Sequence, residues 1–223
     1  MENFKICSMF SLEHTLAKPL LEGAEYPWEV LGQIKEFIIA LGKTLPADEY
    51  DQVEENVWIA KSARVAPTAY IGAPAIIGKD AEIRHCAFIR GSALVGEGAV
   101  VGNSTELKNV ILFDKVQVPH YNYVGDSILG YHAHMGAGSI TSNIKADQTS
   151  VTIQFPGEKF NTGLRKMGAM LGDWADIGCN SVLNPGTVIG PHTNVYPLSM
   201  VRGSVPSNSI YKKAGEVVEK IPR

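Results

Sequence analysis

The chain of 223 residues has little of what marks secreted, membrane or nucleic-acid-binding proteins. Its three cysteines, Cys7, Cys86 and Cys179, are odd in number and far apart, so neither a disulfide framework nor a cysteine metal site is predicted. The formal net charge of -3 supplies no basic stripe for nucleic acid. Because no apolar run could span a membrane and the N-terminus lacks the layout of a signal peptide, we expect a cytoplasmic protein with no membrane partner.

What the chain does have is an aliphatic residue at every sixth position. From Ile59 to Leu107 the period is unbroken, and a small residue such as Ala81 or Ala99 follows four positions after nearly every aliphatic one. The period loosens between Leu112 and Met135 and returns from Leu171 to Val201. Neither a helix nor a hairpin has this period, which is typical of hexapeptide-repeat β-helices.

Three hexads make one triangular coil of about eighteen residues, and successive coils stack at the spacing of neighbouring strands. The aliphatic residue points inward, and the narrow corners need small residues or turn formers, as in Ile71-Gly-Ala-Pro and Ile189-Gly-Pro-His. We therefore predict an all-β fold, a parallel β-helix of six to seven coils whose repeats are stable only when stacked.

Two segments do not follow the repeat. Residues 1–55 contain a predicted helix from Pro27 to Gly42, and we expect them to form a helical cap over the N-terminal end of the prism, followed by an acidic linker. The β-helix then covers 56–206 with an excursion over 141–170. A turn at Pro156-Gly157-Glu158 predicts that this excursion is an extruded hairpin. Residues 207–223 remain as a C-terminal tail.

Residues able to do chemistry concentrate where the period fails, between Glu106 and Asn143. A neutral imidazole at His120 could take a proton from an incoming amine or hydroxyl, although a surface histidine at a coil corner has the same pattern. His132 and His134 could join His120 or His192 in a metal site, but no pair has the five-residue separation of metal-using β-helix enzymes, and we predict no metal.

Arg90, Lys108 and Lys166 are candidate phosphate ligands, or solvated charges on the prism surface. Glu106 and Lys108 could also form a simple surface ion pair with each other. The small residues from Met135 to Asn143 would let a ligand approach the backbone, or would serve a tight corner.

Two stretches, Val118–Gly130 and Met135–Asn143, resemble the acetyltransferase half of the bacterial bifunctional UDP-N-acetylglucosamine pyrophosphorylase/glucosamine-1-phosphate N-acetyltransferases. Two others, Gly163–Gly172 and Ser181–Gly190, resemble the C-terminal prism of archaeal-type sugar-1-phosphate nucleotidylyltransferases. The likeness extends over residues 57–206, and it implies a left-handed coil.

The resemblance also implies roles. His120 would be the general base that deprotonates the amino group of a sugar, and the backbone at Ala137 would face the thioester of acetyl-CoA. Cys179 stands where the family has a serine at the coenzyme site, and Ile144 where it has a tyrosine. His134 replaces an asparagine that contacts the sugar. The matched substrate ligands are Arg90, Glu106, Lys108, Tyr123, His134 and Lys166, and the matched coenzyme residues are Ala137, Asn143 and Cys179.

The resemblance thus implies an acyltransferase that moves acetyl from acetyl-CoA to the amine of an amino-sugar phosphate, in homotrimers with sites between prisms. No nucleotide-binding loop precedes the prism, so a separate nucleotidylyltransferase chain is a possible partner. One alternative is a non-catalytic trimeric module that binds a sugar nucleotide or a partner enzyme, and another is acylation of a hydroxyl or a different amine. Tyr211–Lys213 could touch a coenzyme phosphate or be solvated.

Overall fold

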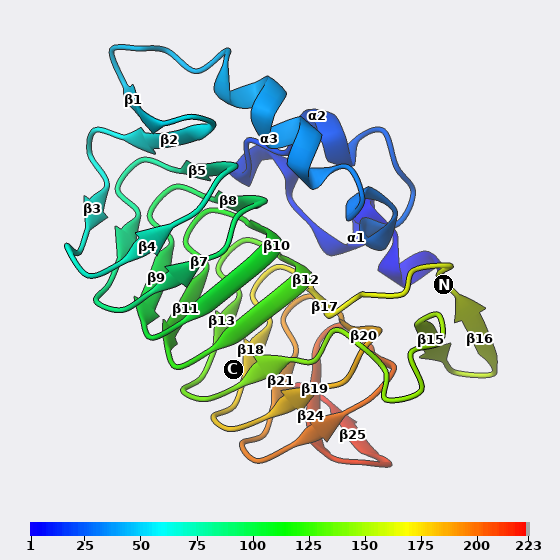
Figure 1. Ribbon diagram of the computed structural model, residues 1–223. Coiled ribbons are helices and arrows are strands. Elements are labelled where there is room, and N and C mark those ends of the chain that lie inside the picture. Colours follow the sequence, from blue (N-terminus) through cyan, green and yellow to red (C-terminus); the bar gives the residue numbers. More distant parts are fainter. Residues whose placement is uncertain (222–223) are drawn as a thin grey trace.

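The computed structural model describes residues 1–221. From β2 onward, short parallel strands are stacked in a triangular prism (Figure 1). Face 1 comprises β2 (Val57–Ala60), β5 (Ala75–Ile77), β8 (Ala93–Val95), the second halves of β10 (Glu106–Leu112) and β12 (Tyr123–Leu129), β17 (Ala169–Leu171), β20 (Thr187–Ile189) and β23 (Ser204–Val205).

Face 2 comprises β3 (Arg64–Val65), β6 (Glu82–Ile83), β9 (Val100–Asn103), β11 (Gln117–His120), β13 (His134–Met135), β18 (Asp176–Ile177), β21 (Asn194–Val195) and β24 (Ser209–Lys213). Face 3 comprises β4 (Tyr70–Ile71), β7 (Phe88–Ile89), the first halves of β10 and β12, β14 (Ile140–Thr141), β19 (Val182–Leu183) and β22 (Met200–Val201). We number the corners in chain order: corner 1 joins faces 1 and 2, corner 2 joins faces 2 and 3, and corner 3 joins faces 3 and 1.

This is the left-handed parallel β-helix that the six-residue period predicts, and the prediction of fold class is confirmed. The stack is longer than the six to seven coils expected, because faces 1 and 2 each hold eight strands in the described part of the chain. The loosened hexads from Leu112 to Met135 still form coils in parallel register, and the segment after Val201 adds further strands.

Inward aliphatic residues build the core. Ile77, Ile83, Ile89, Val95 and Leu107 are all at most 1% exposed. Burying a side chain of this size contributes about 1.5–3 kcal/mol. In the first coil the corresponding Ile59, Val65 and Ile71 stay partly exposed, because no coil lies above them. The repeat therefore stabilises itself from the second coil onward.

The N-terminal segment does not cover the end of the prism, and the prediction of an end cap is wrong. Its helices run along the outside of face 1 (Figure 1): η1 (Glu2–Phe4), α1 (Ile6–Met9), η2 (Leu12–His14), α2 (Lys18–Leu21), η3 (Pro27–Val30) and α3 (Ile34–Gly42). The predicted single helix from Pro27 to Gly42 is instead a 3-10 turn followed by α3.

The reason is an apolar stripe on the outer side of face 1. Ile76, Leu94 and Ile111 are neighbours in the ladder, point away from the prism interior and are fully buried. Helix α3 lies against β5, β8 and β10, so its own apolar side chains, such as Ile34 and Ile38, complete a second hydrophobic layer.

Strands are also found in two places where the sequence analysis expects a linker and a tail. β1 (Tyr50–Glu54) pairs antiparallel with β2 inside the expected linker. β25 (Glu216–Glu219) pairs antiparallel with β24 inside the expected tail, whose last two residues, 222 and 223, lie outside the described residues. Each pairing covers one edge of a sheet, which limits edge-to-edge association.

The excursion forms the predicted hairpin, with β15 (Thr152–Phe155) and β16 (Glu158–Asn161) joined at Pro156-Gly157. Aromatic side chains of the N-terminal segment hold it in place. The ring centroids of Phe4 and Phe155 are 5.3 Å apart, and those of Trp28 and Phe160 are 5.7 Å apart. Within residues 1–221, no helix is long and apolar enough to cross a membrane.

Candidate functional site

Polar side chains on face 3 and at corner 3 form two neighbouring bonded groups around β10 and β12. Arg90 Nη1 lies 2.9 Å from Glu106 Oε1, and Lys108 Nζ lies 2.8 Å from Asp126 Oδ1. Asn143 Nδ2 donates to Asp126 Oδ2 at 2.6 Å and to Tyr123 Oη at 3.2 Å. We call these six residues the face-3 network. The ion pair between Glu106 and Lys108 that the sequence left open is not formed, since each has a different partner.

The centre of this network is Asp126, which the sequence analysis did not select. Its side chain is only 5% exposed, and its backbone has the unusual φ of +48° at corner 3. Besides Lys108 and Asn143, the Asn109 amide donates to it at 2.9 Å. A buried carboxylate requires such partners. A lone Asp inside the apolar stretch Val124–Leu129 is the signal that could have identified it.

Electrostatics shift the pKa values of Arg90 and Tyr123 in this network. The hydrogen bond to Glu106 raises the pKa of Arg90, so this guanidinium carries its charge at any physiological pH. Burial, with a smaller contribution from Asp126, raises the pKa of Tyr123 and keeps its phenol protonated. The network therefore holds two cations, each paired with a carboxylate, and one neutral hydroxyl.

At corner 2, beside this network, three of the predicted residues follow one another on successive coils. Gly138 N–H donates to the His120 carbonyl at 3.0 Å, and Asn180 N–H donates to the Ala137 carbonyl at 2.8 Å. These bonds place His120, Ala137 and Cys179 in one column, which we call the corner-2 column. The His120 side chain is exposed, and its ring makes no hydrogen bond within residues 1–221.

Two predicted ligands lie apart from the corner-2 column and the centre of the network. His134 is on face 2, where its Nδ1 lies 2.8 Å from Asp176 Oδ1, and this hydrogen bond lowers the pKa of Asp176. Lys166 is at corner 3 next to the network, because the following Met167 N–H donates to the Asn143 carbonyl. The Lys166 side chain is exposed. Elsewhere, His132 and His192 lie at corner 1, and no three His, Cys, Asp or Glu side chains converge among the described residues.

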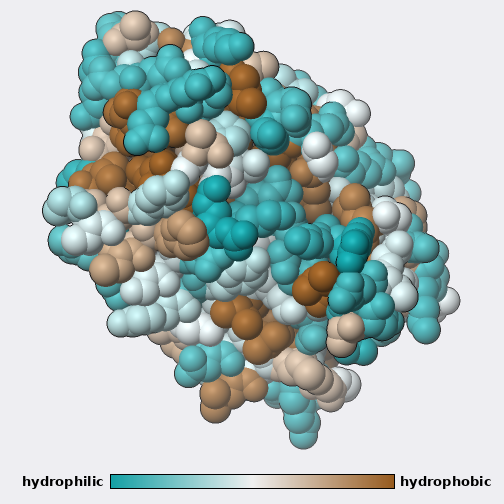
Figure 2. Space-filling model, in the orientation of Figure 1, coloured by the Kyte–Doolittle hydropathy of each residue, from teal (hydrophilic) through white to brown (hydrophobic). Residues whose placement is uncertain are grey.

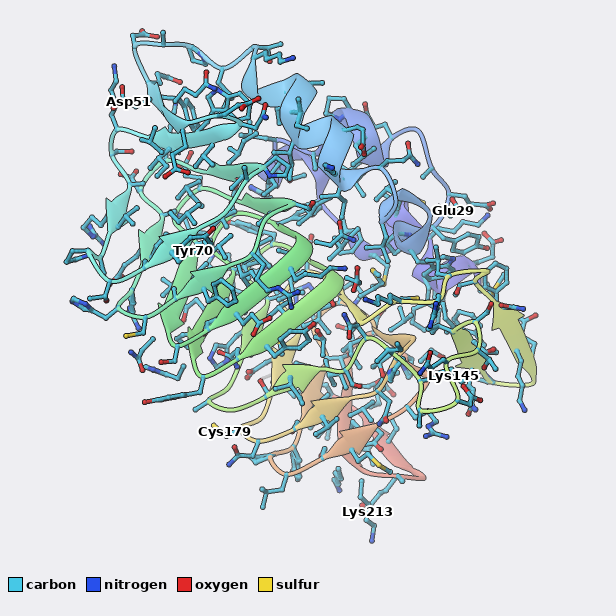
Figure 3. All side chains as sticks on the ribbon, in the orientation of Figure 1. Glu29, Asp51, Tyr70, Lys145, Cys179 and Lys213 are labelled. Atoms are coloured by element: carbon cyan, nitrogen blue, oxygen red, sulfur yellow. The ribbon has the colours of Figure 1, made fainter. Side chains whose placement is uncertain are left out.

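The surface around the corner-2 column is open and partly apolar. Exposed fractions are 66% for Tyr121, 79% for Leu198 and 62% for Met200. Phe88 and Tyr70, further along face 3, are also exposed. Figure 3 shows Tyr70 and Cys179 on the side of the prism opposite the excursion that carries Lys145. Figure 2 shows apolar patches separated by polar side chains on the side of the molecule that it presents. A cavity of about 690 Å³ on face 2 is lined by His85 and Asn103, and Asn103 is the strand neighbour of His120.

No protein-family model matches the chain. It is 31% identical over 109 residues to a bifunctional sugar-1-phosphate nucleotidylyltransferase/acetyltransferase of Sulfurisphaera tokodaii, and the matched residues make up 49% of this chain and 27% of the relative. It is 34% identical over 119 residues to the bifunctional protein GlmU of Methanococcus vannielii, which is 53% of this chain and 28% of the relative. The chain is a relative of these bifunctional enzymes. The match covers less than a third of their length.

A search of solved structures matches the chain to a putative acetyltransferase of Bacillus cereus. Its sequence identity to this chain is 18%, its TM-score is 0.41, and the match covers 74% of this chain and 77% of the other.

Proposed function

We propose that this chain is an acyltransferase that moves the acetyl group of acetyl-CoA to the amine of an amino-sugar phosphate. The observation that carries the proposal is the position of an unpaired imidazole, His120, at a corner of face 3, whose network supplies the cations Arg90 and Lys108. A phosphate would bind Arg90 and Lys108, and the sugar would then lie toward Tyr123 and the corner-2 column.

In the proposed reaction the amine nitrogen attacks the thioester carbonyl. His120 takes a proton from the nitrogen, the C–N bond forms, the C–S bond breaks, and the thiolate leaves and receives a proton. Ala137 N–H donates no hydrogen bond within the described residues, so it is available to stabilise the oxygen that becomes negative. No covalent enzyme intermediate is required.

Further support for acyl transfer is that one of the two relatives is named as a bifunctional nucleotidylyltransferase/acetyltransferase. We further propose that the protein acts as a homotrimer. The exposed apolar residues along corner 2, such as Tyr121 and Leu198, need a cover, and a second prism on them would enclose the open site.

The test is release of free thiol from acetyl-CoA in the presence of glucosamine 1-phosphate. We expect His120→Ala to lower kcat/KM by a factor of about 10²–10⁴, which is what a positioned general base contributes. The matched control is His192→Ala, because His192 is also exposed but lies at corner 1. A wild-type rate no higher than that of His120→Ala contradicts the proposal. A panel of other amines and hydroxyl acceptors defines the substrate.

The same assay separates catalysis from binding alone. The non-catalytic alternative predicts that sugar nucleotides raise the melting temperature while no acceptor supports thiol release. For the enzyme, Arg90→Gln and Lys108→Gln should raise KM for the sugar phosphate much more than they lower kcat, because the proposal makes both side chains ligands of the phosphate.

A further inference from the structure

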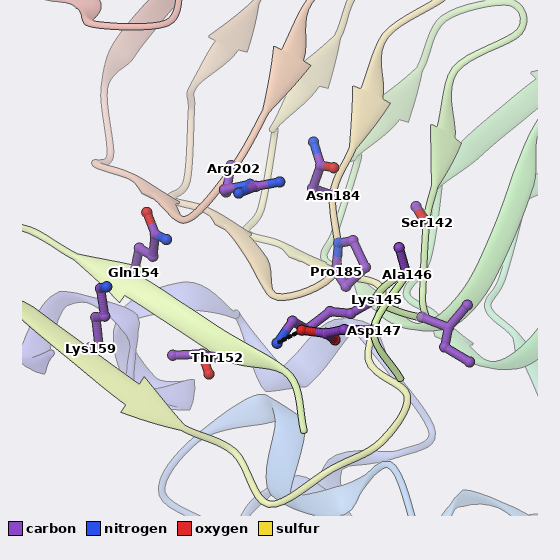
Figure 4. A pocket seen from close by; sticks show the side chains of 11 residues that line it. Ser142, Lys145, Ala146, Asp147, Thr152, Gln154, Lys159, Asn184, Pro185 and Arg202 are labelled. Atoms are coloured by element: carbon purple, nitrogen blue, oxygen red, sulfur yellow. Dashed lines mark ion pairs between the residues drawn. The ribbon is translucent and has the colours of Figure 1, made fainter. Parts of the chain in front are cut away.

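A second polar site lies at corner 3, away from the corner-2 column. A cavity of about 660 Å³ separates the excursion from the coils that contain β14, β19 and β22 (Figure 4). Ser142, Asn184 and Arg202 line it from the prism, and they are consecutive neighbours along the ladder. Lys145, Gln154 and Lys159 line it from the excursion.

The walls of this cavity are fixed in position. Gly186 and Gly203 at corner 3 both have a φ of +81°, and a Cβ on either would lie within 3 Å of the excursion, against Val151 and Gln154 respectively. On its other side the hairpin is held by Trp28 through Phe155 and Phe160. A site between such surfaces is preorganised and loses little entropy when a ligand binds.

The charge in the cavity is unbalanced. Lys145 has its counter-charge in Asp147, at 3.5 Å. Arg202 and Lys159 have no ion-pair partner within residues 1–221, although the chain as a whole has a net charge of -3. The Gln154 amide also makes no hydrogen bond within that range. Two free cations and a free amide donor favour a ligand with two adjacent negative groups.

The remaining wall is apolar, since Ile144, Ala146 and Pro185 line it, and the volume is that of a small-molecule site. We propose that this cavity binds the diphosphate group of an organic ligand, with the Arg202 guanidinium and the Lys159 ammonium as its two cationic contacts. The apolar wall would take the organic part of the ligand.

This site is separate from the proposed acyl-transfer site. The Asn143 side chain belongs to the face-3 network, whereas its neighbours Ser142 and Ile144 line the cavity. One short segment thus has the network on one side and the cavity on the other. The proposal does not depend on His120 or on acetyl transfer.

Calorimetric titration of the full chain with pyrophosphate tests the site. We expect binding at least tenfold tighter than that of inorganic phosphate, and at least a tenfold loss in both Arg202→Gln and Lys159→Gln. The matched control is Lys43→Gln, which removes an exposed cation next to α3, and it should bind like the wild type. Because both cavity cations are exposed, the melting temperatures of the variants should not change.

The same titration is repeated with two organic diphosphates, UDP and coenzyme A, since a diphosphate could come from a nucleotide sugar or from the coenzyme. The ligand, UDP or coenzyme A, whose affinity falls in Arg202→Gln identifies the source of the diphosphate. The proposal is overturned if pyrophosphate does not bind at millimolar concentration, if the two cavity variants bind it as well as the wild type, or if the affinity of neither UDP nor coenzyme A depends on Arg202.

Discussion

The coils before and after residue 112 share one core but differ at their surface. From β2 to the first half of β10 the repeat is uninterrupted, and the outer residues of face 3 contact one another, as in Tyr70 with Phe88 and Arg90 with Glu106. From β12 onward, corner 3 opens into the excursion, whose hairpin returns to the N-terminal segment. The inward residues set the prism, whereas the features that could bind ligands gather around the interruption.

The interruption leaves the coil itself unchanged. β17 pairs with β12 as if nothing stood between them. At corner 1, the His132 ring on one side of the excursion stacks on the Trp174 ring on the other side, with centroids 4.0 Å apart. The excursion is therefore an addition to a finished core, and its position depends on contacts far away in the sequence.

The largest effect on stability should come from removing the contact that docks the excursion. Trp28 is 1% exposed beneath the hairpin, so Trp28→Ala should lower the free energy of unfolding by about 3–5 kcal/mol. Trp174 is 46% exposed, and Trp174→Ala should cost much less. Chemical denaturation measures both. Equal losses of unfolding free energy in the two variants would mean that Trp28 stabilises the protein no more than an exposed side chain on the surface of a coil, and would contradict this prediction.

A smaller effect should follow from pushing the hairpin away from corner 3. Gly186 and Gly157 both have φ near +80°, so Gly→Ala strains the backbone at each. Only at Gly186 would the new Cβ also press on Val151, which should add about 1–3 kcal/mol to the loss. Thermal melting of the two variants compares them. If they melt alike, the hairpin does not lie against the prism as described.

The smallest effect concerns pH and the stack that bridges the interruption. Burial against Trp174 lowers the pKa of His132 below its ordinary value of 6.5. The unfolded chain therefore binds this proton at a higher pH than the folded chain, and stability should fall as pH drops below that value. We expect His132→Gln to weaken this dependence. NMR titration of the His132 imidazole should give a midpoint below 6.5, and a midpoint at or above 6.5 would contradict this account.

The six-residue period and the Pro156-Gly157 turn were enough to predict the prism and the hairpin. The position of the N-terminal segment was not predicted, although its signal is in the sequence. Ile76 and Leu94 each precede an inward residue in the sequence and are themselves one coil apart. Their apolar side chains therefore form a stripe on the outer side of face 1, which indicates that this side is also covered. The six-residue period considers only the inward residue of each hexad, so it does not reveal this outer apolar stripe.

The site was predicted only in part for a related reason. His120, Ala137 and Cys179 lie in one column because each occupies corner 2 of its coil. Equivalent positions of successive coils are neighbours in the structure, so the repeat predicts this column from the sequence. The role of Asp126 depends on three donors, Lys108 and Asn109 from the coil before it and Asn143 from the coil after it. Lys159 and Arg202 line one cavity only because the hairpin docks on Trp28, a contact that no local pattern records.

The central claim is that His120 and the face-3 network form one acceptor site. A crystal structure with coenzyme A and glucosamine 1-phosphate bound tests it most directly. The account predicts the phosphate on Arg90 and Lys108, the amine within hydrogen-bond reach of His120, and the thiol end of the coenzyme beside Ala137. Both ligands bound elsewhere, with the His120 ring in contact with neither, would contradict it.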